Sequence, residues 1–305
     1  MKRFLSISLA FLLPVCCLLA LGEWLVRSYP TSYGLKAHLA STQHAQAHTL
    51  VFGNSRAYYG IFTDSLDHAL NLANVSQTLE YDCFYLLHYF ADAGELRNVV
   101  VQMDYSNVFD PPLERSSWDD YRCTYYRLYA GCDKHSVLSR YGMELFNPER
   151  FKMKLPHALN WVFTGESQLD CDSTGFGITT TRRFDASRMG HATANGLARY
   201  NAIDLDMMPY NAQFLHQMGQ FCQSHHVRFI LVAMPIWHEL YEQKGHDEEP
   251  LLAQLVQDCR ERYGAEFRDY TADDRMRDED FIDAVHLSPK GAAHFTQLLQ
   301  SDFGL

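Results

Sequence analysis

One short stretch decides how this chain is expected to fold, and it reads Thr49-Leu50-Val51-Phe52-Gly53-Asn54-Ser55-Arg56. Its first four residues are the β-branched and aromatic kind that fills a buried parallel strand. Gly53 permits a turn that a Cβ would obstruct. Ser55 is therefore expected at the carboxyl end of a strand, where open α/β sheets bind ligands. The alternative is an ordinary strand-to-helix loop in which Ser55 caps the helix.

Segments typical of strands alternate with segments typical of helices along most of the chain. Predicted strands are 69–73, 98–103, 228–234 and 266–270, and predicted helices are 79–93, 211–226, 251–263 and a closing helix that begins at Ser288 with Pro289 in its first turn. This alternation predicts βαβ units, and hence a parallel sheet with helices on both faces. The fold class is therefore α/β.

The alternation stops between Asp110 and about Pro209. This region is rich in Tyr, Arg and Trp, and it is too long for a plain connection. We predict an insertion at about 110–209 within a domain that spans 28–305, folded over the carboxyl edge of the sheet to shape a substrate cleft. The alternative is a solvent-facing cap whose aromatic side chains are purely structural.

The amino terminus has the pattern of a membrane segment. Lys2 and Arg3 precede residues 4–21, which carry no charge. These eighteen residues would span about 27 Å as a helix, close to the hydrocarbon thickness. The basic residues favour a cytoplasmic amino terminus, which places the remainder on the periplasmic or extracytoplasmic side of the inner membrane. We predict an anchor over 1–27; the alternative is a cleaved signal peptide, but the apolar stretch is longer than usual for one and no convincing small-x-small cleavage site follows it.

Composition excludes some classes of partner. The chain has 305 residues and a formal net charge of −11, without any cluster of lysine or arginine. A nucleic-acid surface would be basic, so no nucleic-acid partner is expected. The sequence has no CxxC pair and no His/Cys pattern of the zinc type. Neither a structural metal nor a cofactor is predicted.

A second motif lies near the carboxyl terminus, where Asp283 and His286 stand three residues apart just ahead of a helix. A serine hydroxyl becomes a good nucleophile when a neighbouring base removes its proton, and that base needs a carboxylate to hold its tautomer. Ser55, His286 and Asp283 can fill these three roles. The alternatives are a structural or capping histidine and a solvated loop aspartate.

These motifs resemble those of the SGNH/GDSL hydrolase superfamily. Gly53-Asn54-Ser55 looks like its first block and Asp283-x-x-His286 like its last, while 71–78 and 104–107 fall where the oxyanion blocks belong. The resemblance implies a flavodoxin-like three-layer α/β/α fold and an acyl-ester mechanism through a serine.

The Gly-Asn-Ser-Arg version and the membrane anchor are most similar to bacterial envelope members of that superfamily, such as alginate O-acetylation enzymes and the D-alanyl transfer protein of teichoic acid synthesis. In such systems the domain works beside a membrane-bound O-acyltransferase, which supplies the acyl group, and modifies a polysaccharide.

The sequence also departs from the family pattern. Asn54 replaces the usual aspartate, the second-block glycine has no clear counterpart in 71–76, and no Gly-x-Asn-Asp block is present. The oxyanion candidates are the backbone N–H of Ser55 together with Asn74 and Asn107. Forming turns is the alternative role of both asparagines.

Three further residues are candidates for binding substrate. Arg56 can steer an anionic sugar or cap the turn, and Trp237 and His238 can stack on a sugar ring or simply pack. We expect a serine-dependent acyltransferase or esterase that acts on O-acyl groups of an envelope or extracellular polysaccharide, with transfer and hydrolysis left open. The alternative is a catalytically silent scaffold or glycan-binding partner of an O-acyltransferase.

Overall fold

The computed structural model describes residues 1–178 and 183–305. Its packing divides the chain into two compact units: unit 1 comprises Met1–Leu35 and Trp118–Leu169, and unit 2 comprises Lys36–Ser117 and Asp170–Leu305. The predicted insertion at 110–209 includes parts of both units and the residues 179–182, which lie outside the described residues. Its limits, and those of the predicted anchor and catalytic domain, stay predictions.

Unit 2 is built on one parallel sheet with the strand order β2-β1-β3-β4-β5. The strands are β1 (Thr49–Phe52), β2 (Ala69–Asn71), β3 (Asn98–Gln102), β4 (Arg228–Ala233) and β5 (Glu266–Asp269). In the register, Val51 lies beside both Asn71 and Val100. The central strands are buried as their apolar runs predict, whereas the edge strand β5 exposes charged side chains. The predicted α/β class with a parallel sheet is confirmed.

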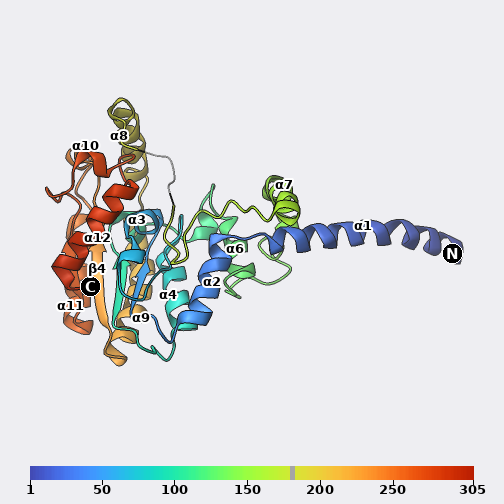
Figure 1. Cartoon of the computed structure of the whole chain (residues 1–305), viewed down its shortest axis with the longest axis horizontal. Helices are drawn as coiled ribbons and strands as arrows, with labels where there is room; N and C mark the ends of the chain where they lie inside the picture. Colours follow the sequence, from blue (N-terminus) through green and yellow to red (C-terminus); the bar gives the residue numbers. More distant parts are fainter. Residues whose placement is uncertain (179–182) are drawn as a thin grey trace. The chain divides into compact units, whose positions relative to one another are not determined.

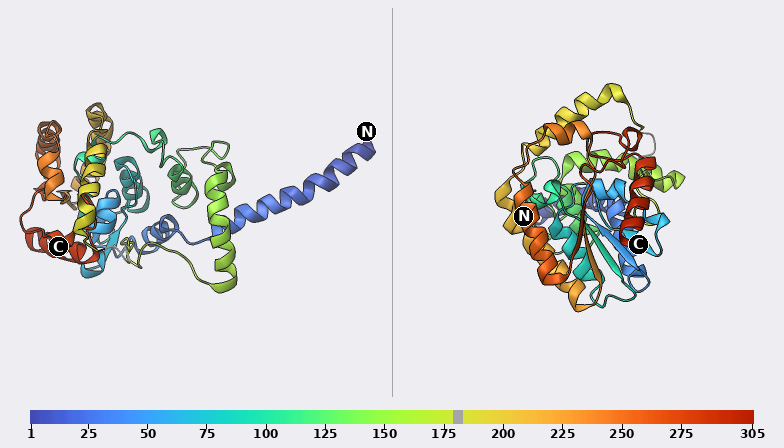
Figure 2. Two further views of the ribbon diagram at one scale, coloured as in Figure 1. Left: turned by 90° about the horizontal axis from the view of Figure 1, so that it is seen from above. Right: turned by 90° about the vertical axis from the view of Figure 1, so that its left-hand side faces the viewer.

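Helices cover both faces of this sheet. Helices α4, α9 and α11 pack side by side, and α12 packs on α3. Right-handed crossovers place these two groups on opposite faces, and Figure 2 (right) shows the sheet between α11 in orange and α12 in red. The α-helices of unit 2 are α3 (Ser55–Gly60), α4 (Leu79–Tyr89), α5 (Tyr105–Val108), α8 (Ala186–Tyr200), α9 (Met208–Ser224), α10 (His238–Gln243), α11 (Glu249–Tyr263) and α12 (Pro289–Phe303).

Local chemistry sets the helix ends. The Ser288 hydroxyl accepts a hydrogen bond from Gly291 N at the start of α12, and Pro289 takes the first helical position as predicted. The helix predicted over 79–93 ends earlier, at Tyr89, because Phe90 already leaves the helical conformation, with φ −117° and ψ 27°. Ala93 and Gly94 follow with positive φ in the turn that leads to β3. Among the described residues of unit 2, short 3₁₀ helices complete the connections: η1 (Thr63–Ser65), η2 (Leu113–Arg115), η4 (Leu205–Met207) and η5 (Asp278–Asp280).

Unit 1 contains the apolar amino-terminal helix α1 (Lys2–Ser28), together with α6 (Arg122–Leu128), η3 (Glu144–Phe146) and α7 (Pro148–Thr164). Helix α2 (Ser32–Gln43) begins in the last residues of the first segment of unit 1, which ends at Leu35, and continues into unit 2. Within α1, Ser6–Ser28 is long and apolar enough to cross a membrane, with a mean hydropathy of 2.2. Figure 1 shows α7 beside the carboxyl-terminal part of α1.

Candidate functional site

Gly53 forms the sharp turn that follows β1. Its φ is +142°, and a Cβ there would lie 2.6 Å from Cβ of Gln102 and 2.9 Å from Cβ of Ala57. Its N–H donates to the buried carboxylate of Asp82 at 3.1 Å. Burial raises the pKa of Asp82 to about 7, against the effect of its hydrogen bonds from Gln77 and Gly53. Only glycine fits this turn, as the sequence predicted.

We expect Gly53→Ala to lower the free energy of unfolding by at least about 1–3 kcal/mol, because the new methyl group is strained in this conformation and overlaps its neighbours. Urea denaturation of the full chain in detergent measures the change. Gly190→Ala is the matched control, since a Cβ at this position of α8 meets nothing within 4 Å. Equal stability of the two variants would contradict the role given to Gly53.

Asn54, rather than Ser55, caps helix α3. Its Oδ1 accepts a hydrogen bond from Arg56 N at 3.0 Å, so the capping alternative for Ser55 is wrong. Its Nδ2 donates to the carbonyl oxygen of Ser106 at 2.9 Å and to the Ser106 hydroxyl at 3.0 Å. An aspartate has no N–H for this contact with a carbonyl, which gives a physical reason for the asparagine in this turn.

The Ser55 side chain lies next to the loop that carries the second motif. Its Oγ is 2.8 Å from Nε2 of His286, and Nδ1 of His286 is 3.1 and 3.0 Å from the two carboxylate oxygens of Asp283. Burial alone would raise the pKa of Asp283. Hydrogen bonds from the His286 side chain and from the backbone N–H groups of Val285 and His286 outweigh burial and lower this pKa to about 2. A charged Asp283 favours the tautomer in which Nδ1 of His286 donates and Nε2 is free to accept.

A tight loop holds Asp283 and His286 in place. Phe281 and Leu287 form an antiparallel bridge, and Ile282 N donates to the carbonyl oxygen of His286 at 3.0 Å. Phe281, Ala284 and Leu287 are buried, while the two polar residues between them are partly exposed. The loop is therefore anchored by its apolar residues and presents its acid and base towards β1.

A buried polar network lies behind the Ser55 turn. The Arg56 guanidinium is 2.9 Å from the Asp104 carboxylate, both side chains are 3% exposed, and Arg56 also donates to the Met234 carbonyl at 2.6 Å. Asp104 accepts from Met234 N at 3.2 Å, and the Gln102 side chain accepts from Asn54 N at 3.1 Å. The ends of β1, β3 and β4 are thus tied together. Arg56, predicted as a substrate-binding candidate, is enclosed in this network.

The three oxyanion candidates occupy different places. Ser55 N belongs to the first residue of α3, where backbone N–H groups have no partner inside the helix. Asn74 lies beside the turn, because its N–H donates to the Gly53 carbonyl at 3.2 Å. Asn107 instead completes the capping box of α5, whose N-cap is Asp104: its side chain accepts from Asp104 N and donates to the Gln102 carbonyl. The turn-forming alternative therefore describes Asn107.

A groove of about 1310 Å³ opens beside Asp283 and His286. Its other wall is helix α8 and the residues just before it, which contribute the exposed side chains of Arg183, Arg188 and Arg199. Sequence reasoning placed an insertion here but named none of these residues. The arginines within a region that lacks strand patterns were the available signal.

Trp237 and His238 lie outside this groove. The Trp237 ring is 4% exposed and packs against Phe184 and Phe281, with ring centroids 5.6 and 5.8 Å away. Trp237 and His238 line a different cavity of about 250 Å³. Packing, the alternative given for Trp237, is therefore what the structure shows.

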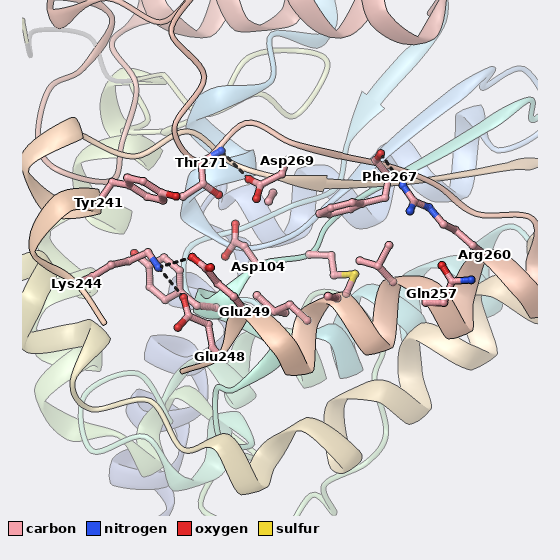
Figure 3. A pocket seen from close by; sticks show the side chains of 16 residues that line it. Asp104, Tyr241, Lys244, Glu248, Glu249, Gln257, Arg260, Phe267, Asp269 and Thr271 are labelled. Atoms are coloured by element: carbon pink, nitrogen blue, oxygen red, sulfur yellow. Dashed lines mark hydrogen bonds and ion pairs between the residues drawn. The ribbon is translucent and has the colours of Figure 1, made fainter. Parts of the chain in front are cut away.

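A further cavity of about 430 Å³ lies between α11 and the carboxyl ends of β3, β4 and β5 (Figure 3). At its polar end Lys244 is 2.8 Å from Glu248 and 3.4 Å from Glu249. Of the described residues that line it, none belongs to the Ser55–His286–Asp283 set. It borders the site through Asp104, the ion-pair partner of Arg56, and through Tyr105, whose ring centroid is 5.4 Å from the Arg56 guanidinium.

Comparison with known proteins adds little to this geometry. No family model matches the chain, and no curated protein matches it. One solved structure, described as "a putative platelet activating factor from Streptococcus pneumonia", aligns with 97% of this chain and 98% of its own, at 10% identity and a TM-score of 0.42. This likeness carries no argument about activity.

Proposed function

We propose that this protein is a serine-dependent enzyme that transfers or hydrolyses O-acyl groups through an acyl-serine intermediate. The observation that carries the proposal is the continuous hydrogen-bonded chain from Ser55 Oγ through His286 to Asp283. Ser55 and His286 are 231 residues apart in the chain, and they meet just beyond the carboxyl end of β1, the side of a parallel sheet where ligands bind. A serine beside a histidine that is oriented by a carboxylate is the arrangement that nucleophilic catalysis requires.

The reaction would proceed in two steps. As Ser55 Oγ attacks the ester carbonyl, Nε2 of His286 takes its proton, and Asp283 stabilises the imidazolium. The N–H of Ser55 and a donor from Asn74 would stabilise the oxyanion. Collapse expels the alcohol, which takes the proton from His286, and leaves an acyl ester on Ser55. His286 then takes a proton from water or a second hydroxyl, which attacks this ester, and returns that proton to Ser55 Oγ as the acyl–Ser55 bond breaks.

The proposed substrate is an O-acylated polysaccharide. In support, the groove beside His286 is open and large, and exposed arginines line it. Guanidinium groups donate several hydrogen bonds and suit the hydroxyl and carboxylate oxygens of sugars. The resemblance to envelope members of the SGNH/GDSL superfamily supports the same substrate and adds a membrane-bound O-acyltransferase as the acyl donor.

We also propose that α1 is kept as a single-pass anchor, with unit 2 on the extracytoplasmic side. In support, the end of α1 belongs to the core of unit 1: the Glu23 carboxylate is 5% exposed and accepts hydrogen bonds from Glu144 N at 3.0 Å and Leu145 N at 2.9 Å. Cleavage at a site near Leu21 would leave Glu23 in the first turn of a shortened helix, without the preceding turns of α1 that now hold it in helical conformation.

The second candidate is a catalytically silent scaffold or glycan-binding partner of an acyltransferase. The contacts of Asn107 favour it, because the side-chain amide of this expected oxyanion donor is already bonded to the Gln102 carbonyl in the capping box of α5.

A fluorophosphonate probe separates the two candidates, because it reacts only with an activated serine. We expect stoichiometric labelling of the full chain at Ser55, read by intact mass and peptide mapping. Ser55→Ala should remove the label, whereas Ser301→Ala, which alters an exposed serine of α12, should keep it. An unlabelled wild-type chain would favour the silent scaffold.

A further inference from the structure

Exposed apolar side chains are concentrated in unit 1. Monomeric soluble proteins rarely expose large contiguous apolar patches, so such a concentration marks an interaction surface. Four of these side chains belong to one helix, α7: Met153, Leu159, Val162 and Phe163 are 62, 43, 54 and 83% exposed.

One face of α7 packs against the end of α1. Phe151, Leu155 and Trp161 surround a core formed by Leu25, Val26, Tyr29 and Ala158. This contact begins immediately after the uncharged segment 4–21, since a Cβ on Gly22 would already lie 3.0 Å from the Phe151 ring. Helix α7 is therefore held at the level where α1 would leave the hydrocarbon.

A second face of α7 points towards α6. The Arg150 guanidinium is 3.7 Å from the ring centroid of Tyr121, and Lys154 Nζ is 3.8 Å from that of Tyr125. Helix α6 in turn packs on Tyr33, which follows α1 in the chain, with a centroid distance of 5.1 Å between Tyr33 and Tyr125. This face is thus turned towards the carboxyl-terminal end of α1.

The third face carries Leu159 and Phe163. At 100° per residue these two side chains lie on the side of α7 opposite to Arg150 and Lys154, together with Lys152. They therefore point away from α6, to the side on which we infer that the exposed apolar part of α1 extends. Figure 2 (left) shows α7, in light green, running crosswise to α1 where the exposed part of α1 begins.

We propose that α7 is an interfacial helix that lies in the plane of the bilayer, with Leu159 and Phe163 inserted among the acyl chains of the leaflet from which α1 emerges. The proposal rests on the proposed role of α1 as a membrane anchor. A helix that crosses a membrane-spanning helix at the lipid surface lies in that surface, and such helices bury their apolar face about 5–10 Å deep. Lys152 can extend its ammonium group to anionic headgroups while its stem stays apolar.

The consequence is attachment of unit 1 at two points. A single spanning helix leaves rotation about its axis and tilt free, whereas a second helix in the interface restricts both. Unit 1 would then keep one orientation towards the membrane and hold α1 in place through the Glu23 and Leu25 contacts.

Spin labels on the full chain in liposomes of phosphatidylcholine and phosphatidylglycerol test the proposal. In a Cys16→Ser/Cys17→Ser background, which removes the two exposed cysteines, labels are placed at Phe163→Cys and Leu159→Cys. His157→Cys is the matched control, since His157 is exposed on the Arg150 side of α7. A label on Cys16, in a Cys17→Ser chain, reports separately whether α1 lies in lipid.

We expect labels at 159 and 163 to collide with oxygen in the lipid and to lose collisions with a water-soluble nickel chelate, relative to the label at 157. Water-exposed labels at 159 and 163, with Cys16 in lipid, would overturn the proposal and leave the anchor intact. Labels shielded from both reagents and broadened by spin–spin coupling would also overturn it, because a second copy of the chain would then cover this face. The readout is independent of catalysis, so it does not depend on the proposed enzyme activity.

Discussion

Replacing Ser55 with alanine is expected to lower ester turnover by about 10⁴- to 10⁶-fold, because the chain then lacks the nucleophile that the neighbouring histidine activates. The measurement is acid release from p-nitrophenyl acetate by the full chain in detergent. His286→Ala should cause a loss of similar size, and the double variant should lose little more, because the residues of such a set act as a unit.

Two controls make this result interpretable. Ser301→Ala should keep wild-type turnover, since Ser301 is exposed near the end of α12. Ser55→Ala should also keep the melting temperature of the wild type, because the partly exposed hydroxyl contributes little to packing. Wild-type turnover in Ser55→Ala would contradict the proposed mechanism.

The second large effect is expected at the buried ion pair of Arg56 and Asp104. Removing one partner leaves an uncompensated charge at a site where both side chains are 3% exposed. We therefore expect Arg56→Met to lower the free energy of unfolding by about 3–5 kcal/mol. The Ser55 turn should also lose its alignment, because Arg56 follows Ser55 directly and ties it to the end of β4. Chemical denaturation and ester turnover measure the two effects.

A double-mutant cycle isolates the charge effect. Arg56→Met leaves the buried Asp104 carboxylate without its cation, and Asp104→Asn removes that charge. We therefore expect the double variant to lose less free energy of unfolding than the two single variants lose together. Arg262→Met is the matched control, because its own side chain is exposed and its partner Asp258 on α11 is partly exposed, at 59 and 30%; its stability should stay close to that of the wild type. A similarly small effect for Arg56→Met would contradict the role of the network.

Sequence patterns predicted the strands and the two motifs better than the surroundings of the site. The apolar run from Thr49 to Phe52 is typical of a buried parallel strand, and the glycine after it is typical of a sharp turn. Both β1 and its turn could therefore be predicted from local sequence. The partners of Arg56 were not, because they lie at the ends of β3 and β4 and no local pattern indicates a contact 178 residues away. The groove wall formed by α8 was missed for the same reason.

The sequence alone determined the α/β architecture, the apolar amino-terminal helix and the choice of Ser55, His286 and Asp283 as the candidates for chemistry. These depend on short-range properties: side-chain periodicity, a glycine at a turn and the spacing of an acid and a base. Tertiary structure alone decided that Asn54 caps the helix, that Arg56 is enclosed rather than exposed, and that α7 lies across α1 with an apolar face uncovered. These depend on which side chains distant segments bring together, and burial and charge pairing at such contacts are properties of the folded chain.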